Sequence, residues 1–497
     1  MHVAIVGSGF GGLGTALRLR DAGLDDFVVL ERAGDVGGTW RDNSYPGCAC
    51  DVESHLYSLS FAPTAEWTHR YSRQAEIWDY LRRCARDGGL LPRIRFDTEV
   101  LSAAWDESWR EWRMATSRGE FRAAVLVLAT GPLSAPALPA LPGLAAFAGR
   151  VFHSARWDHD YDLRGRRVAV IGTGASAIQF VPAIQPLVAR LHLFQRTPAW
   201  VLPRFDGPIR GWQRRLYAAV PLLQRGLRAA IYLYREASVL LFRHPALMRR
   251  LQWVALRHLR RAIRDPALRA RLEPRYTMGC KRILLSNDYY PALAQPNVEV
   301  VTSGIQEVRA HSIVDAAGVE REVDAILLGT GFTPTDPPLA AHVRGRHGRT
   351  LRETWAGSPR AHLGTTVAGF PNLFLLLGPN TGLGHTSVLY MLEAQITHVV
   401  EALRFMRSRG LDAVEPRAEA QAAFVSAVDR DMRGTVWTAG GCASWYLDRT
   451  GRNSTLWPGF SWSFRRRVSR FRPQDYAATP ARKPEEEAAL AAARAHP

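Results

Sequence analysis

Residues 3–12 read VAIVGSGFGG, and this stretch decides the fold. Its apolar start predicts a short buried strand over residues 2–7, followed by a glycine turn and a helix to about Ala22. A second apolar run, Phe27-Val-Val-Leu30, predicts the next strand. Strand, helix and strand in this order open a βαβ unit, so the sequence predicts an α/β fold with a parallel sheet.

The glycines of this stretch have the G-x-G-x-x-G spacing of a dinucleotide-binding turn. Gly7 permits the tight turn, Gly9 lacks the Cβ that would block a pyrophosphate, and Gly12 lets the helix pack closely on the strand. The positive end of the helix then faces the phosphates. Glu31 ends the second strand about twenty residues on, where its carboxylate can bind the ribose hydroxyls.

The segment after Glu31 indicates which dinucleotide binds at this first turn. It contains Gly37-Gly38-Thr39-Trp40 and then Tyr45-Pro-Gly-Cys-Ala-Cys-Asp51. Trp and Tyr are costly to leave in an exposed loop, and a buried Asp needs a partner. We therefore expect this loop to lie against the flat ring system of FAD, with a Gly/Pro-rich surface loop as the alternative.

A second fingerprint follows another predicted strand, residues 167–172. Its third glycine is replaced by alanine, which the fold allows, and it consists of Gly172, Gly174, Ser176 and Ala177. The next strand ends in Arg196 and Thr197 rather than in an acid. An arginine here favours the 2′-phosphate of NADP. Lys281, one of only two lysines in the chain, is a further candidate cation.

Two dinucleotide turns predict two Rossmann-like domains, one for FAD and one for NADP, with an inserted helical subdomain. We expect the FAD-binding domain to consist of residues 1–146 and 371–472, with a mobile loop in the second part. We expect the NADP-binding domain to consist of residues 147–208 and 275–370. A helical insertion at 209–274 interrupts it, and a tail follows at 473–497. The tail is rich in Ala, Pro and Glu, a composition typical of disorder.

The net charge of +18 and the pI of about 10.3 come mainly from the insertion. Residues 210–271 contain fifteen arginines against Glu236 and Asp265. The favoured interpretation is a group of helices packed over the core with a solvated arginine face. The alternative is a basic amphipathic surface for an anionic membrane. No nucleic-acid-binding motif accompanies the charge, so a nucleic acid is not an expected partner.

The cysteines and the N-terminus bear on the compartment. Five cysteines, an odd and sparse set, argue against a disulfide framework and for a reducing cytoplasm. The N-terminus runs straight into a strand, which leaves no room for a signal peptide, and no uncharged apolar run is long enough to span a bilayer. Cys48 and Cys50 are interpreted as small buried residues, and His385 and His398 as structural histidines.

Residues 147–158, FAGRVFHSARWD, match every fixed position of the Baeyer–Villiger monooxygenase signature F-x-G-x-x-x-H-x-x-x-W-[P/D]. The fixed positions are Phe147, Gly149, His153, Trp157 and Asp158. Residues 37–51 match a second signature of that family, from a Gly-x-Trp pair through Tyr-Pro-Gly to an Asp. The chain thus resembles Baeyer–Villiger monooxygenases from residue 2 to about 465; flavin-containing and N-hydroxylating monooxygenases are also similar but typically lack Trp at position 157.

The resemblance implies roles for individual residues. Arg282 would stabilise the negatively charged flavin peroxide and the tetrahedral adduct, and Asp51 would pair with it. Trp445 would close a mobile loop over NADP, while His153 and Trp157 would couple domain movement to catalysis. The expected cofactor-binding residues are Gly7, Gly9, Gly12, Glu31, Gly38, Thr39, Trp40, Asp51, Tyr57, Val100, Ala129, Gly172, Gly174, Ser176, Ala177, Arg196, Thr197, Lys281 and Trp445. Divergent segments at 440–442 and 453–458 leave the substrate open.

The implied activity is insertion of one oxygen of O2 beside a ketone carbonyl, through a flavin C4a-peroxide, with FAD and NADPH as cofactors. A permanently charged guanidinium suits this chemistry because it lowers the pKa of the peroxide. Two alternatives are oxidation of sulfur or nitrogen and a flavin reductase that oxygenates nothing. The expected partners are a small ketone and O2, in a monomer or homodimer without a metal site.

Overall fold

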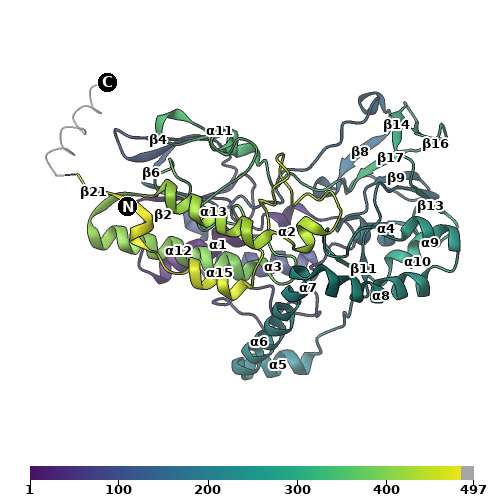
Figure 1. The fold of residues 1–497 in the computed structure, drawn as a ribbon, viewed down its shortest axis with the longest axis horizontal. Helices are drawn as coiled ribbons and strands as arrows, with labels where there is room; N and C mark the ends of the chain where they lie inside the picture. The colour runs from purple at the N-terminus through teal and green to yellow at the C-terminus, as the bar shows by residue number, and fades with distance from the viewer. Residues whose placement is uncertain (483–497) are drawn as a thin grey trace.

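Each fingerprint turn follows a strand of a five-stranded parallel sheet, as the sequence predicts (Figure 1). The computed structural model describes residues 1–482. The first sheet has the order β19-β7-β1-β2-β3. Its strands are β1 (Val3–Val6), β2 (Phe27–Leu30), β3 (Ile94–Arg95), β7 (Val125–Leu128) and β19 (Leu373–Leu375). The apolar runs that predict the strands are buried at almost every position, because helices or a second sheet cover both faces.

The second sheet has the order β13-β10-β9-β17-β8. Its strands are β8 (Arg150–His153), β9 (Arg167–Ile171), β10 (Arg190–Phe194), β13 (Val298–Val301) and β17 (Ala325–Leu328). Both sheets place their glycine turn beside a central strand, and β7 and β17 run alongside β1 and β9 in parallel register. The α/β class with two Rossmann-like cores is therefore confirmed.

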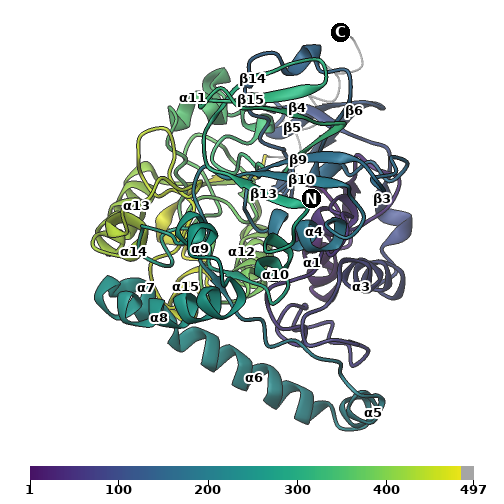
Figure 2. The same cartoon turned by 90° about the vertical axis from the view of Figure 1, so that its right-hand side faces the viewer.

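Helices from both halves of the chain cover the sheets (Figures 1 and 2). The first core contacts α1 (Phe10–Asp21), α3 (Gln74–Asp87) and α12 (Val388–Arg409), and the second α4 (Ala177–Ile184) and α10 (Tyr289–Leu293). The remaining helices outside the insertion are α2 (Thr39–Asp42), α11 (Leu351–Trp355), α13 (Ala418–Met432), α14 (Val436–Ala439) and α15 (Ser461–Val468). The long α12 packs on α1, so the C-terminal part of the chain completes the first core.

A mainly antiparallel sheet that the sequence did not predict covers the other side of the first core. The strands β4 (Val100–Asp106), β5 (Glu111–Thr116) and β6 (Gly119–Ala123) pair antiparallel, and the short β18 (Val343–Arg344) pairs parallel with β4. Trp112 and Met114 alternate with outward residues and are completely buried against the same cluster that contains Ala4 and Val6 of β1. Smaller pieces are β11 (Val201–Leu202), β12 (Leu284–Leu285), β14 (Ile305–Val308), β15 (Ser312–Asp315) and β16 (Glu320–Glu322).

The insertion is helical; its first two helices project from the body, and the other three lie against it (Figures 1 and 2). Its helices are α5 (Gly211–Ala219), α6 (Pro221–Ala237), α7 (Val239–Arg243), α8 (Pro245–Ala262) and α9 (Pro266–Leu272). Nothing among residues 1–482 has both the helix length and the hydropathy needed to cross a bilayer.

Two expectations need correction. The chain after residue 472 is not disordered throughout, because β21 (Tyr476–Pro480) pairs antiparallel with β20 (Leu411–Pro416) and Tyr476 is buried. The rest of the expected tail, residues 483–497, lies outside the described residues. The cysteines are not all free either, because Cys280 and Cys442 form a disulfide. Cys48, Cys50 and Cys84 are free and buried, as expected for the first two.

Candidate active site

The first glycine turn has the shape of an open phosphate cradle. Gly7 has φ +99°, and a Cβ there would lie 2.8 Å from the carbonyl oxygen of Ala129. A Cβ on Gly12 would overlap the Gly7 carbonyl. At Gly9, in contrast, the nearest atom to an added Cβ is Gly38 Cα at 3.8 Å, so the protein leaves that space free. Helix α1 starts there without a side-chain cap or an acid in its first turn, so its N–H groups can bind an anion.

Glu31 has a structural role that the sequence did not predict. Its buried carboxylate accepts hydrogen bonds from Ser8 N at 2.8 Å and Ser8 Oγ at 2.7 Å. Arg41 Nη1 donates to it at 3.0 Å. These contacts pin the glycine turn to the end of β2. The ribose contact expected for Glu31 stays a prediction.

Aromatic residues of the predicted FAD loop gather beside the first turn. Trp40 Nε1 donates to the Tyr57 hydroxyl at 3.1 Å, and the Tyr57 ring meets Phe10, the first residue of α1, edge-on at 5.3 Å between centroids. Burial raises the pKa of Tyr57 well above its usual value, so the hydroxyl stays protonated. Gly38 and Thr39 lie at the start of α2 in the same loop. The expected residues therefore meet around the cradle, and the aromatic wall fits a flat cofactor.

Two other members of the expected set lie on strands of this half. Ala129 follows β7 and faces the Gly7 turn. Val100 is buried at the start of β4, opposite Thr116 of β5. Their contact with a cofactor stays a prediction.

Arg282 and Asp51 meet in a bidentate ion pair. Arg282 Nε donates to one carboxylate oxygen at 2.8 Å and Nη2 to the other at 2.7 Å, across 231 residues of sequence. Burial opposes ionisation of Asp51, yet Arg282 outweighs it and lowers the pKa of the carboxyl below its usual value. The Asp51 charge raises the pKa of Arg282 further above its usual value. The two side chains remain 26% and 34% exposed, so the pair is accessible to a ligand.

Three residues near this pair escaped the sequence analysis. Arg235, from the end of α6, donates Nε to Glu53 at 2.9 Å and Nη2 to the Asp51 carbonyl oxygen at 3.4 Å. Tyr446 is buried, and burial raises the pKa of its hydroxyl to about 12. The nearby Arg282 guanidinium opposes this rise. The position of Tyr446 directly after Trp445 was the only sequence signal.

The second glycine turn repeats the geometry of the first. Gly172 has φ +109°, and a Cβ there would overlap the Gly329 carbonyl. At Gly174 the nearest atom to an added Cβ is 4.0 Å away, so this turn also leaves room for a phosphate. Ser176 caps α4 without a side-chain hydrogen bond, and Ala177 is its first residue. The local geometry is what a dinucleotide pyrophosphate requires.

Two cations lie where the 2′-phosphate is expected. Arg196 is exposed just after β10, and Lys281 is half-buried, its ammonium 5.3 Å from the centre of the Tyr276 ring. Burial, together with the Arg196 charge, lowers the pKa of Lys281. No carboxylate pairs with either cation among the residues that the structure describes. Thr197 accepts a hydrogen bond from Thr173 through its carbonyl. Uncompensated cations of this kind attract a dianionic phosphate.

The linker signature lies along β8 and the turn that follows it. A Cβ on Gly149 would overlap the Asp324 carbonyl and crowd the Phe147 ring, which explains the glycine. His153 ends β8 with burial lowering its pKa, and Nε2 has no partner within residues 1–482. Asp158 pairs with Arg150, and Trp157 packs on Phe180 of α4. The signature is therefore anchored to the second core.

Residues of α4 connect the two cores. Gln179 accepts from the Tyr45 hydroxyl at 3.0 Å and donates to the Ala49 carbonyl oxygen at 2.9 Å. Phe180 contacts both Tyr45 and Trp157. The loop that leads to Asp51 is thus tied to the helix that starts at the second glycine turn.

The loop with Trp445 lies next to the Arg282 segment. Trp445 is 44% exposed and contacts the ring of Tyr446. The disulfide joins Cys442, three residues before Trp445, to Cys280, which directly precedes Lys281. Closure of this loop over a bound cofactor stays a prediction.

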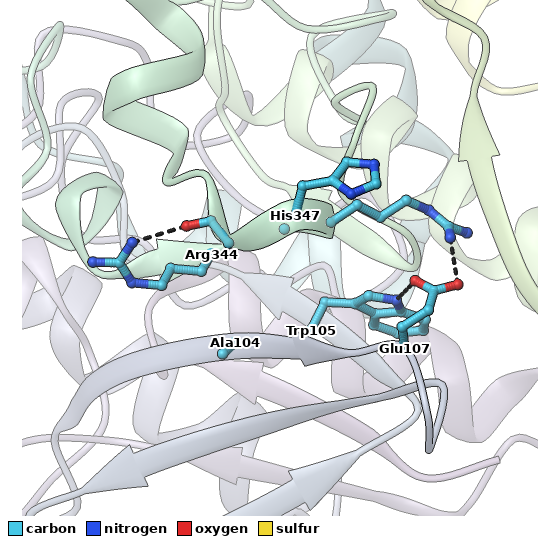
Figure 3. A pocket seen from close by; sticks show the side chains of 8 residues that line it. Ala104, Trp105, Glu107, Arg344 and His347 are labelled. Atoms are coloured by element: carbon cyan, nitrogen blue, oxygen red, sulfur yellow. Dashed lines mark hydrogen bonds and ion pairs between the residues drawn. The ribbon is translucent and has the colours of Figure 1, made fainter.

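A hollow elsewhere is not the candidate site. It has a volume of about 260 Å³ on the antiparallel sheet and is lined by Ala104, Trp105, Glu107, Arg344 and residues 345–348 (Figure 3). Its polar groups pair with one another: Trp105 Nε1 donates to Glu107 at 2.8 Å, and Arg346 also binds Glu107 (Figure 3). Neither glycine turn contributes to it.

Comparison with known proteins agrees with this geometry. Residues 1–347 match the family of flavin-binding monooxygenase-like proteins. The chain is 55% identical to a Baeyer–Villiger monooxygenase of Streptomyces coelicolor, over 96% of this chain and 92% of that protein. A solved steroid monooxygenase bound to NADP is 33% identical, with a TM-score of 0.87 over 97% of this chain and 99% of the other. A cyclohexanone monooxygenase from Rhodococcus sp. Phi1 bound to NADP+ is 28% identical, with a TM-score of 0.85 and the same coverage.

Proposed function

This chain belongs to the flavin-binding monooxygenase-like family and, within it, to the Baeyer–Villiger monooxygenases, and from this premise we propose its reaction. It is a monooxygenase that depends on FAD and NADPH. It inserts one oxygen atom of O2 between the carbonyl carbon of a ketone and a neighbouring carbon, which gives an ester or a lactone. The observation that carries this proposal is the accessible, bidentate ion pair of Arg282 and Asp51.

The first turn fits FAD and the second fits NADPH. FAD, reduced by NADPH, supplies the chemistry that activates O2. The open space at Gly9 receives the FAD pyrophosphate, and the wall of Trp40 and Tyr57 borders the ring system. The space at Gly174 receives the NADPH pyrophosphate, with Arg196 and Lys281 on the 2′-phosphate.

Arg282 stabilises the negative charge that develops on oxygen during the transfer. Its guanidinium keeps its proton at any pH the protein survives, whereas a lysine in its place would lose its proton more easily. Asp51 holds the guanidinium plane through two hydrogen bonds, and Arg235, which is itself held by Glu53, donates to the backbone carbonyl of Asp51. A donor fixed in this way costs no reorganisation when charge appears.

The residues around the pair limit the entry of water. Tyr446 and Tyr57 stay neutral because burial raises the pKa of both hydroxyls. Trp445, 44% exposed on the loop next to Arg282, would cover bound NADP when that loop closes. Exclusion of water strengthens the field of Arg282 on the developing charge.

Product analysis tests the proposal. The FAD-loaded enzyme with NADPH is given cyclohexanone, a steroid ketone and an aryl methyl sulfide, the first two because similar solved structures are named for such substrates. We expect lactone or ester in proportion to the NADPH consumed. Formation of sulfoxide without ester would show that the enzyme oxidises heteroatoms instead. Oxidation of NADPH without any oxygenated product would show that it is a flavin reductase.

A further inference from the structure

The helical insertion carries an unusual amount of exposed apolar surface. Half of the exposed large apolar side chains in residues 1–482 lie between Trp212 and Trp253, a small part of the chain. They are Trp212, Leu216, Val220, Leu222, Leu223, Leu233, Tyr234, Leu240, Leu247 and Trp253. Leu222 and Tyr234 are 72% and 73% exposed. Exposed apolar side chains concentrated in this way mark an interaction surface.

Helix α6 has one face for the protein and one for a partner. Gln224, Arg228 and Arg235 point inward, where they donate hydrogen bonds to Thr64, His55 and Glu53 respectively. Leu222 and Leu233 lie on the opposite face by helical spacing, and both are exposed. These inward contacts fix the orientation of α6, so the exposure of its outward face is a feature of the folded helix.

Helix α8 has the same division with more charge. Met248, Ala255 and Leu259 are buried on one side. The other side consists of Arg249, Arg250, Trp253, Arg257, Arg260 and Arg261, all exposed. A hollow of about 360 Å³ between Trp253, Leu256 and the last three of these arginines is of a size to hold an anionic group.

The charge of the surface has a single sign. Ten arginines are exposed between residues 210 and 264, and the one acid in that range, Glu236, is buried against Ser461 and His385. A second copy of the same face would bring positive charge against positive charge, because a two-fold interface uses the same surface patch on both subunits. The partner must therefore be anionic and must also accept apolar side chains.

We propose that helices α5 to α8 dock this enzyme on an anionic phospholipid bilayer. Trp212, Leu222 and Leu233 enter the boundary between headgroups and acyl chains, and the arginines bind lipid phosphates. Each arginine near an anionic leaflet multiplies the binding constant about five-fold. The helices lie on the bilayer and do not cross it, in agreement with their length and hydropathy.

Docking would bring the lipid surface close to the candidate active site. Helix α6 presents Leu222 and Leu233 outward, and near its end Arg235 reaches Glu53 and the Asp51 carbonyl. An apolar ketone dissolved in the bilayer would then have a short path to Arg282.

Vesicle sedimentation with the FAD-loaded, full-length protein tests the proposal. Vesicles of phosphatidylcholine alone are compared with vesicles that contain about one-third phosphatidylglycerol. We expect binding only to the anionic vesicles, and release at about 0.5 M salt, where charges are screened within about 4 Å. Arg257→Ser with Arg260→Ser should weaken binding about thirty-fold, and Leu222→Ser with Leu233→Ser at least about ten-fold.

Leu101→Ser with Arg409→Ser is the matched control, because both residues are exposed and lie outside the insertion. It should leave binding unchanged, and bound FAD and the melting temperature verify that each variant folds. Absence of binding to anionic vesicles at low salt overturns the proposal, as does equal binding to phosphatidylcholine. A third outcome is a dimer in sedimentation velocity that the insertion variants convert to monomer, together with no binding to vesicles. That result would show that the surface serves self-association instead.

Discussion

The Arg282 guanidinium donates from both Nε and Nη2 to one carboxylate, so its position is fixed before any substrate arrives. We predict that Arg282→Ala keeps NADPH oxidation but lowers product formation by about 10²–10³, the usual cost of losing such a donor. Product per NADPH, with FAD content as the folding check, measures this. An unchanged yield of ester would remove Arg282 from the reaction.

Burial and the nearby Arg196 charge lower the pKa of Lys281, and no acid pairs with either cation within residues 1–482. We predict that Arg196→Ala raises the KM for NADPH about 10–100-fold and that for NADH little, since a charge-assisted hydrogen bond contributes about 1.5–3 kcal/mol. Arg190→Ala is the control, because Arg190 lies at the opposite end of β10 and donates to Pro296. Equal effects of Arg196→Ala on both cofactors would reject the phosphate contact.

At this scale, the sequence predicts residues that belong to a local motif and does not predict contacts between residues that only the fold brings together. The glycines and Arg196 follow from local spacing. The Asp51–Arg282 pair came from the resemblance alone, because 231 residues separate its members. Arg235 and Glu53 were missed because no periodicity links two residues 182 apart.

The turn between β1 and α1 separates two effects of glycine. A Cβ on Gly12 overlaps the protein itself, whereas a Cβ on Gly9 meets only Gly38 Cα at 3.8 Å. We predict that Gly12→Ala destabilises the fold by about 1–3 kcal/mol, while Gly9→Ala folds normally and binds FAD more than about ten-fold more weakly. Thermal unfolding of the apoprotein and FAD titration distinguish them. Normal FAD affinity in Gly9→Ala would place the pyrophosphate elsewhere.

The C-terminal strand β21 depends on a neutral histidine. His398 bonds the Val468 carbonyl at 2.8 Å and the Tyr476 hydroxyl at 2.8 Å, and burial lowers the pKa of His398 to about 4. Below pH 6.5 the unfolded chain takes up a proton there and the folded chain does not, so stability falls as the pH falls towards 4. From pH 6.5 to 5 this amounts to about 2 kcal/mol.

We predict that His398→Gln lowers the melting temperature at pH 7.5 but reduces its decrease between pH 7.5 and 5. Parallel melting curves of variant and wild type against pH would contradict this account. The strand itself was not predictable, since an Ala- and Pro-rich tail has no strand signal until Tyr476 finds its buried site beside α12. The strands β1, β2, β9 and β10 were predictable because each is a short apolar run in or after a dinucleotide fingerprint, whereas β3, β8 and β13 were not predicted.

At the scale of the molecule, the two dinucleotide cores are linked through α4. Gln179 holds both Tyr45 and Ala49 of the FAD loop. We predict that Gln179→Ala keeps both cofactors but releases a several-fold larger share of the consumed NADPH as hydrogen peroxide, because loosened cores admit water. Gln185→Ala is the control, since Gln185 bonds Asn297 within the second core. Unchanged peroxide release would show that this contact does not govern closure.

The two fingerprints and the linker signature predict the order of the domains along the chain. They do not predict the angle at which the insertion projects. Arg228 and Arg235 of α6 bind residues 51–58, far back in the sequence, whereas composition alone describes them as solvated charge. The expected packing over the core with a solvated arginine face holds for α8 but not for α6.

The bond between Cys280 and Cys442 ties the strip that ends in Lys281 and Arg282 to the stretch that leads to Trp445. While the disulfide is intact, a displacement of either segment is transmitted to the other. The predicted movement of the Trp445 loop would therefore also shift Lys281. A reductant that cleaves the bond would let the two segments move independently.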